Sequence, residues 1–188
     1  MNPWILLDEI TVPGDGGIMK LYQRAHEFSI SIKNDELMNS RMHGSEDALA
    51  ELACKRVADR EKPRVLIGGL GMGFTLSAAL ANLDTNAEVV VAELVPAVVK
   101  WNRTHLAELA GHPLDDPRVT VHESDVRLLI KADKDAYDAI LLDVDNGPSA
   151  MTDSSNRRLY NREGIRTCHR ALREHGCLAV WSAEPSKK

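Results

Sequence analysis

Glycines and acidic residues stand in this sequence at positions suited to ligand binding and proton transfer. Residues 64–73 read RVLIGGLGMG, so Gly69, Gly71 and Gly73 lie between a short apolar run and a helical pattern. Glycines permit positive φ values and close approach of the backbone to a ligand, and a helix N-terminus offers free N–H groups. The segment therefore predicts a nucleotide-binding loop, with a plain tight turn between strand and helix as the alternative.

The spacing of these glycines separates two classes of nucleotide ligand. Dinucleotide-binding loops follow the pattern G-x-G-x-x-G, in which the third glycine allows close packing of helix on strand. Here the position three residues after Gly71 is occupied by Phe74. This departure disfavours a nicotinamide-dependent oxidoreductase.

Acidic residues stand where three later apolar runs end. Glu93 closes one run, Asp125 follows the next, and Asp143 closes a third. Ligands of open α/β sheets bind outside the carboxyl ends of the strands, so we expect these carboxylates and the glycine segment to line one crevice. Glu93 is suited to accept both ribose hydroxyls of an adenosine, or is simply a solvated strand end. Asp125 is suited to the adenine amino group, to capping the following helix, or to both.

The third run continues as D-V-D-N-G-P from Asp143. A carboxylate at Asp143 is placed to orient or deprotonate an attacking amine, and Asp145 to hold a cationic acceptor by its charge. The alternative interpretation of the segment is a plain turn. We therefore predict Asp143 and Asp145 as catalytic residues. Gly69, Gly71, Gly73, Glu93, Asp125 and Asp143 are predicted as cofactor-binding residues, and no metal site is predicted.

Alternation of strands and helices must position these residues. Short apolar runs predict parallel strands at residues 65–68, 88–93, 119–122, 137–143 and 177–182. Helical patterns occupy residues 74–81, 95–110, 126–131 and 156–174, after an earlier helix that starts with Ser45 as its N-cap and ends at Lys62–Pro63. Five strands with helical crossovers predict an α/β fold with a Rossmann-like, doubly wound and mostly parallel sheet.

The N-terminal part has a different pattern. Ile18–Tyr22 and Phe28–Ile32 alternate apolar and polar residues, and a turn signal at residues 13–17 precedes them. These features predict a small antiparallel hairpin that forms a lid at the edge of the main domain. We therefore divide the chain into a lid region, residues 1–44, and a Rossmann-like domain, residues 45–188.

From about Gly16 to Ser182 the sequence resembles the spermidine synthase family, within the class I S-adenosylmethionine-dependent methyltransferase superfamily. That family transfers aminopropyl groups from decarboxylated S-adenosylmethionine. The resemblance is carried, in order, by the segments GGLGMG, AELVPAV, DDPRVTV, SD and YDAILLD. It implies that Glu93 binds ribose, Asp125 binds adenine, and Asp143 is the acidic residue of the catalytic site.

Departures from the family pattern bear on the reaction. The family loop G-G-G-D-G-G has an acid, close to the aminopropyl amine of the donor, where this chain has Gly71. The family loop D-S-S-D-P reads D-V-D-N here, so Asn146 replaces the second acid. Fewer carboxylates suit a diamine acceptor less well, because buried ammonium groups need charged partners.

These departures favour methyl transfer from S-adenosylmethionine to a small acceptor, with amines among the candidates. Without the acid at position 71, no charge repels the carboxylate of that donor. The first alternative is aminopropyl transfer from decarboxylated S-adenosylmethionine. The second is a catalytically silent nucleotide-binding or interaction module.

Composition excludes other classes of protein. The net charge of −5 disfavours broad nucleic-acid binding, and no apolar run approaches the roughly 20 residues that span a bilayer. The N-terminus lacks the basic region of a signal peptide, so we expect a cytoplasmic protein. A methyltransferase-like sheet usually has two further strands after the fifth, and their apparent absence makes a homodimer plausible.

Four weaker patterns complete the sequence. Arg158, Arg162, Arg166 and Arg170 recur every four residues and predict a solvated basic stripe on one helix, or a docking surface for an acidic partner. His43 is either a base near the acceptor or a surface histidine. Trp101 is expected to pack in the core rather than to stack on a ligand. The three cysteines match no metal or redox spacing and are expected to be reduced.

Overall fold

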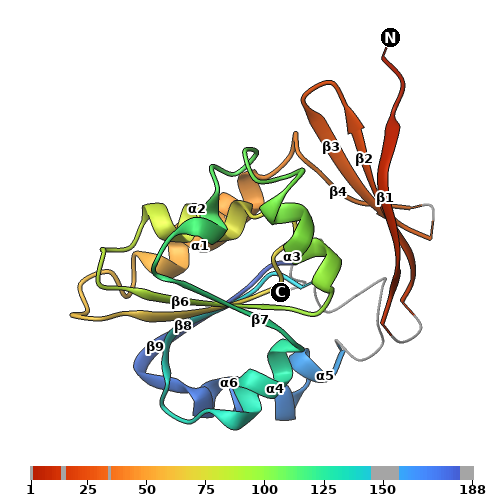
Figure 1. Ribbon diagram of the computed structural model, residues 1–188. Coiled ribbons are helices and arrows are strands. Elements are labelled where there is room, and N and C mark those ends of the chain that lie inside the picture. The colour runs from red at the N-terminus through yellow and green to blue at the C-terminus, as the bar shows by residue number, and fades with distance from the viewer. Residues whose placement is uncertain (1, 14–15, 34, 145–156, 183–188) are drawn as a thin grey trace.

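A computed structural model describes residues 2–13, 16–33, 35–144 and 157–182, which form two β-sheets and their covering helices (Figure 1). The N-terminal sheet is antiparallel, in the order β1-β2-β3-β4. Its strands are β1 (Ile5–Val12), β2 (Gly17–Arg24), β3 (Glu27–Ile32) and β4 (Asp35–Asn39). The two predicted strands lie within β2 and β3. The lid is thus larger than the hairpin expected from the sequence, because the irregular ILLDEITV of β1 and the charged β4 lack a clean alternation.

The second sheet is parallel and has the order β7-β6-β5-β8-β9. This order confirms the doubly wound α/β fold. Its strands are β5 (Arg64–Gly68), β6 (Glu88–Glu93), β7 (Val119–Glu123), β8 (Tyr137–Leu142) and β9 (Leu172–Val180). The central β5 and β8 are apolar and almost wholly buried, as expected of strands that are covered on both faces.

Helices cover the parallel sheet on both faces (Figure 1). One face carries α1 (Gly44–Cys54), α2 (Phe74–Ala81) and α3 (Pro96–Arg103). The other carries α4 (Val126–Ala132), α5 (Arg157–Tyr160) and α6 (Arg162–Ala171). A short 3-10 helix, η1 (Pro113–Asp115), precedes β7. No helix within the described ranges is long and apolar enough to cross a membrane.

Several predicted helix boundaries were wrong. Helix α1 ends at Cys54 and is followed by turns, short of the predicted end at Lys62–Pro63. The N-cap of α1 is His43, not Ser45, because Gly44 already belongs to the helix and the Ser45 hydroxyl donates to Glu46 instead. The helix expected over residues 95–110 ends at Arg103 and continues as turns to Gly111. The helix expected over residues 156–174 is interrupted at Asn161, whose side chain accepts a hydrogen bond from the N–H of Gly164 and caps α6.

The interruption at Asn161 also divides the basic stripe. Arg158 lies on α5, whereas Arg162, Arg166 and Arg170 share α6. All four side chains are exposed, and Arg170 donates to the backbone oxygen of Lys131. Only three of the four arginines therefore share one helix.

A buried aspartate forms hydrogen bonds that connect the amino ends of the parallel strands. Asp138 on β8 is 1% exposed. Its carboxylate accepts hydrogen bonds from the guanidinium groups of Arg60 and Arg173 and from the N–H of Arg64, each at 2.7 Å. Asp138 thus joins the segment after α1 to the start of β9.

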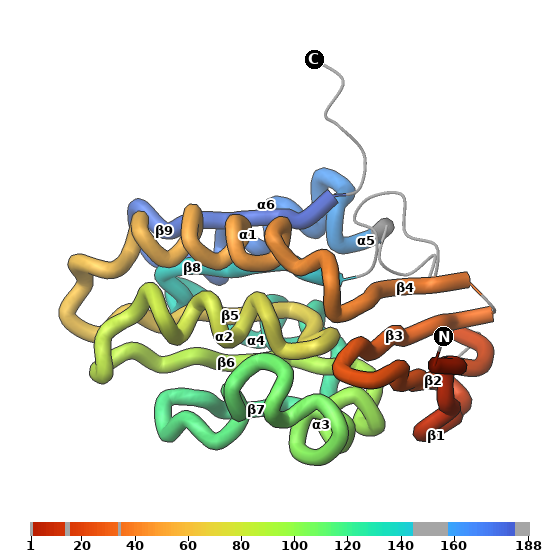
Figure 2. Tube along the Cα trace, turned by 90° about the horizontal axis from the view of Figure 1, so that it is seen from above, coloured from red at the N-terminus to blue at the C-terminus, as the bar shows by residue number. Residues whose placement is uncertain are grey.

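The N-terminal sheet lies at the carboxyl end of the parallel strands (Figure 2). Buried Leu21 and Ile30 belong to the same apolar cluster as Val65 and Leu141 of the parallel sheet. Trp101 of α3 is fully buried, as expected, and its Nε1 donates to Asp8 Oδ2 of β1 at 2.8 Å. The lid is therefore packed against the end of the sheet where the predicted site lies.

Candidate functional site

The order of the parallel strands places the predicted site residues in one row. Asp125 follows β7, Glu93 ends β6, the glycine loop follows β5 and Asp143 follows β8. Because β7, β6, β5 and β8 are neighbours in this order, the row runs along the carboxyl edge of the sheet. That edge is where open α/β sheets bind their ligands.

The glycine loop, residues 69–73, adopts a conformation that requires its glycines. Gly69, Gly71 and Gly73 have φ values of 88°, 53° and 86°. A Cβ atom on Gly69 would lie 2.2 Å from the backbone oxygen of Asp143. One on Gly71 would lie 2.9 Å from Met38 Cε, and one on Gly73 would lie 2.9 Å from Asn102 Oδ1. The glycines thus permit close contact between the loop and three other parts of the chain.

Glu93 holds the glycine loop against the end of β6. The residue is 7% exposed, and its two carboxylate oxygens accept hydrogen bonds from the N–H groups of Leu70 and Val95, each at 2.8 Å. Backbone donors of this kind stabilise an ionised carboxylate. Glu93 therefore has a structural role in the loop beside the ribose contact that the sequence predicts.

Asp143 is the carboxyl group of the row best suited to proton transfer. It is partly buried, and its Oδ2 accepts a hydrogen bond of 2.5 Å from the hydroxyl of Thr75, on α2. The pKa of Asp143 is raised to about 6: burial raises it most, the Thr75 hydrogen bond lowers it, and the negative charge of Glu46 adds a smaller increase. A carboxylate whose pKa lies near neutrality is an effective general base.

Asp125 caps α4, as one of its two predicted roles requires. Its Oδ1 accepts a hydrogen bond from the N–H of Arg127 at 2.8 Å, and both carboxylate oxygens also contact the Arg127 guanidinium. The ion pair leaves Asp125 with less net negative charge to offer a ligand. Its contact with adenine stays a prediction.

His43 lies in the loop before α1, with its side chain 41% exposed and beside the start of α2. Its ring stacks on Phe74 with a centroid distance of 4.2 Å, and its Nδ1 lies 2.8 Å from a carboxylate oxygen of Asp47. Phe74 directly follows the glycine loop and precedes Thr75. The segment before α1 is thus part of the surroundings of Asp143.

One predicted catalytic residue lies outside the described part of the chain. Asp145 and the neighbouring Asn146 fall outside the described residues. Within the described ranges, no group of three or more His, Cys, Asp or Glu side chains is arranged to hold a metal ion.

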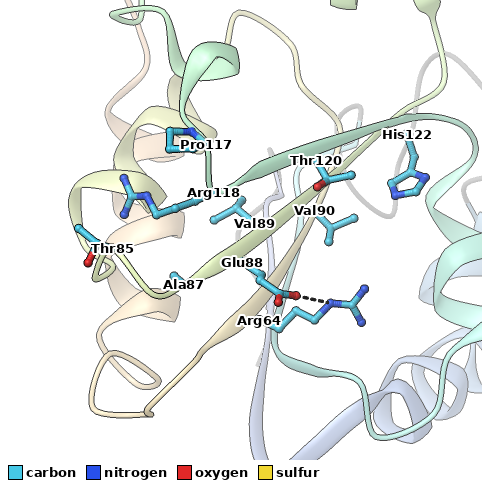
Figure 3. A pocket seen from close by; sticks show the side chains of 10 residues that line it. All are labelled: Arg64, Thr85, Ala87, Glu88, Val89, Val90, Pro117, Arg118, Thr120 and His122. Atoms are coloured by element: carbon cyan, nitrogen blue, oxygen red, sulfur yellow. Dashed lines mark ion pairs between the residues drawn. The ribbon is translucent and has the colours of Figure 1, made fainter.

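A separate hollow of about 400 Å³ lies at the opposite end of the parallel strands (Figure 3). Arg64 and Glu88, at the starts of β5 and β6, form an ion pair of 3.3 Å at its floor. The Arg118 guanidinium on its wall binds Asp116 and the backbone oxygen of Leu83. This hollow is remote from the glycine loop, and Arg64, Glu88 and Arg118 already have partners, so we do not assign it to the site.

Sequence reasoning missed three residues that shape the site. Thr75 contacts Asp143, Met38 contacts the glycine loop from the lid, and Asn102 contacts it from α3. The position of Thr75, two residues after the glycine loop in a helix that starts there, is a signal for a contact with the next strand end. No sequence signal links Met38 or Asn102 to the loop, because both lie about 30 residues away along the chain.

A known protein family matches most of this chain. A family model described as spermine/spermidine synthase domain matches residues 43–186. The chain is 33% identical over 129 residues to polyamine aminopropyltransferase 2 of Pseudomonas aeruginosa, covering 66% of this chain and 35% of that protein. It is 31% identical over 127 residues to a polyamine aminopropyltransferase of Prochlorococcus marinus, covering 67% of this chain and 43% of that protein. The chain thus spans less than half the length of these relatives.

Solved structures share the fold. The spermidine synthase of Thermotoga maritima superimposes with a TM-score of 0.72 at 17% identity, over 93% of this chain and 56% of that one. A spermidine synthase in complex with the transition-state analogue AdoDATO superimposes equally well, at 16% identity over 93% of this chain and 55% of that one. Since the family model covers most of the chain, including every strand end that carries the acidic row, this protein belongs to the spermine/spermidine synthase family.

Proposed function

We propose that this protein transfers an aminopropyl group from decarboxylated S-adenosylmethionine to an amine. The observation that carries the proposal is Asp143, a carboxyl group with a pKa of about 6 beside a glycine loop at the carboxyl edge of the sheet. The names of the related aminopropyltransferases support the same reaction. They favour it over the methyl transfer that the sequence alone suggested.

In the proposed reaction, a neutral amine nitrogen attacks the aminopropyl carbon bonded to the donor sulfonium. The N–C bond forms, the C–S bond breaks, and its electron pair returns to sulfur, which leaves as a neutral thioether. The new ammonium group loses a proton to the Asp143 carboxylate. Such a displacement depends mainly on in-line positioning of the reactants, which a preformed pocket supplies.

The other members of the row would bind the donor. Glu93 would accept hydrogen bonds from the ribose hydroxyls, Asp125 would meet the adenine amino group, and the glycine loop would let the donor approach the backbone. Thr75 would hold the Asp143 carboxylate in one orientation, because it donates to Oδ2. Asp145 would attract the positive charge of the acceptor.

Methyl transfer from S-adenosylmethionine is the second candidate, and one contact favours it. At Gly71, where the family has an acid, the space next to the Cα atom is filled by the thioether of Met38. An apolar group at this position gives no partner to the amine of the decarboxylated donor. Gly71→Asp combined with Met38→Ala removes the contact with Met38 and leaves the aspartate at the positive φ of 53°, which aspartate tolerates better than most residues. This double variant is expected to increase affinity for the decarboxylated donor about tenfold.

Calorimetry with three ligands tests the proposal: S-adenosylmethionine, decarboxylated S-adenosylmethionine and 5′-methylthioadenosine. We expect the decarboxylated donor to bind more tightly than the carboxylated one, and a panel of di- and polyamines to yield aminopropylated product. Preference for S-adenosylmethionine with methylated product would replace the proposal by the second candidate. Binding without turnover across the panel would indicate a silent module, and no binding of any ligand by folded protein would exclude both reactions.

A further inference from the structure

Helix α3 contacts both the N-terminal sheet and the glycine loop through consecutive residues. Trp101 Nε1 donates to Asp8 Oδ2 of β1 at 2.8 Å. The next residue, Asn102, donates from Nδ2 to the backbone oxygen of Gly71 at 2.8 Å and to that of Val98 at 2.9 Å. One turn of helix therefore connects the lid to the loop.

The amide of Asn102 is buried directly against the glycine loop. The residue is 2% exposed, and its Oδ1 has no hydrogen-bond partner within the described part of the chain. That oxygen lies 2.9 Å from where a Cβ atom on Gly73 would be, so it lies directly against the loop. A buried carbonyl oxygen without a partner costs free energy, which an apolar side chain of similar size would avoid. The amide contributes two Nδ2 hydrogen bonds, to Val98 within α3 and to Gly71, and only the second reaches the loop.

Holding the oxygen of Gly71 also orients the next N–H group. The peptide bond is planar and trans, so the N–H of Met72 points opposite to the C=O of Gly71 and away from α3. Peptides that flank a glycine rotate easily, because glycine tolerates many backbone conformations. Without the contact from Asn102, the peptide between Gly71 and Met72 is free to turn.

Met38 of β4 lies against the same glycine. Its Cε and Sδ atoms are 2.9 and 3.2 Å from the position of a Cβ atom on Gly71. Gly71 is therefore held by an amide from α3 and by a thioether from the N-terminal sheet. Any shift of the sheet relative to α3 would move one of these contacts.

We infer that Asn102 is a positioning residue, which fixes the Gly71–Met72 peptide for donor binding and couples the position of the N-terminal sheet to donor affinity. The identity of the donor rests on the proposed function. The positioning of the loop does not, and it can be measured without any ligand.

The test compares Asn102→Ala with Asn82→Ala. Asn82, the C-cap of α2, makes the same kind of bond as the one from Asn102 to Val98, since its Nδ2 donates to the backbone oxygen of Ala78 four residues earlier at 2.8 Å. Among the described residues, Asn82 has no hydrogen bond to the glycine loop, which suits it as the control. We expect amide hydrogen exchange of residues 70–73 to become about tenfold faster in Asn102→Ala and to stay unchanged in Asn82→Ala.

Calorimetry on the same variants measures the coupling to the donor. We expect the Kd for the donor to rise about tenfold in Asn102→Ala, with unchanged stoichiometry and little change in the KM for the acceptor. Unchanged loop exchange in a folded variant would overturn the positioning role. Faster exchange with unchanged donor Kd would overturn the link to binding. If the wild type binds no donor, the proposed function fails, and the exchange measurement alone decides whether Asn102 holds the loop.

Asn102→Asp separates the lost hydrogen bond from a lost volume. This variant has nearly the same shape, but its ionised carboxylate repels the oxygen of Gly71. Protonation restores an O–H donor, so the ratio of its donor Kd to that of the wild type should fall as the pH is lowered. A ratio that is constant with pH and close to one would contradict the inference, even if Asn102→Ala proves too unstable to measure.

Discussion

Asp143 combines a contact with Thr75 and an environment that disfavours its charge. Burial raises its pKa to about 6, so the carboxyl is largely ionised at pH 7.5 and largely protonated at pH 5. If it accepts the proton of the amine, the rate will rise with pH through about 6. The profile of kcat against pH measures this, and Asp143→Asn should reduce kcat by about two orders of magnitude or more while changing donor Kd little. A variant that keeps the wild-type rate would make Asp143 structural.

We expect ionised Asp143 to destabilise the folded state. Because the folded state raises the pKa of Asp143, ionisation is penalised in the folded protein. The penalty is absent below about pH 4, where both states are protonated, and complete above about pH 6. Asp143→Asn is therefore expected to be more stable than wild type at pH 8 by roughly 1–3 kcal/mol, and by much less at pH 4. Urea unfolding at the two pH values checks this, and an equal difference at both would contradict it.

Glu93 is expected to affect both stability and binding. Glu93→Ala leaves the N–H groups of Leu70 and Val95 without their acceptor, which should lower the free energy of unfolding by roughly 1–3 kcal/mol. If Glu93 also binds ribose, donor affinity falls by roughly 1–3 kcal/mol as well. Urea unfolding and calorimetry separate the two effects. Unchanged affinity of the folded fraction would place the ribose elsewhere.

At the scale of elements, the hydrogen bond between Asp8 and Trp101 docks β1 on α3. The Trp101 N–H holds the pKa of Asp8 below its ordinary value, and the nearby Lys100 and His105 act in the same direction. Asp8→Ala should lower the free energy of unfolding by about 1–2 kcal/mol at pH 7, because it leaves the buried indole N–H unpaired. The neighbouring Glu9→Ala removes only a surface ion pair with Lys20 and should cost less than about 1 kcal/mol.

The contribution of Asp8 should depend on pH in a defined direction. A carboxylate with a lowered pKa stabilises the folded state fully above its ordinary pKa, and this stabilisation is lost as the pH falls through the lowered value. The difference between wild type and Asp8→Ala should therefore shrink below about pH 4. Urea unfolding at pH 3 and pH 7 measures it. If the difference in unfolding free energy between wild type and Asp8→Ala is larger at pH 3 than at pH 7, the Asp8 carboxylate does not stabilise the contact between β1 and α3.

At the scale of the whole molecule, Asp138 joins parts of the chain that are far apart in sequence. Asp138→Ala leaves Arg60 and Arg173 without their buried partner and should lower the free energy of unfolding by about 3 kcal/mol. Because Asp138 lies at the amino ends of the strands, donor Kd should not change. Asp135→Ala, at an exposed carboxylate nearby, serves as the control. A loss of affinity in folded Asp138→Ala would contradict the separation of the two ends of the sheet.

Homodimerisation stays a prediction at this scale. Among the described residues, β7 and β9 have a strand neighbour on one side only. Unpaired strand edges tend to associate with another chain. We expect sedimentation velocity to show a dimer whose fraction increases with protein concentration. A single monomeric boundary over a hundredfold range of concentration would contradict this.

The alternation of apolar runs and helical patterns was sufficient to predict the parallel sheet and the row of acidic strand ends. Each run is local, and a buried parallel strand needs little beyond a short apolar segment between breakers. Glu93, Asp125 and Asp143 each end or follow such a run, so the sheet edge gathers them once the strands pair. Helix ends were predicted less well, since the break at Asn161 depends on a side-chain cap that competes with a continuous apolar face.

Only the tertiary structure decided how each of these residues is used. The raised pKa of Asp143 depends on burial and on Glu46, which is about 100 residues away in sequence. The contacts of Met38 and Asn102 with Gly71 depend on how the N-terminal sheet packs against α3. Local patterns encode which backbone conformation a segment prefers, whereas electrostatic environment and loop position arise from contacts between distant segments, which no local pattern contains.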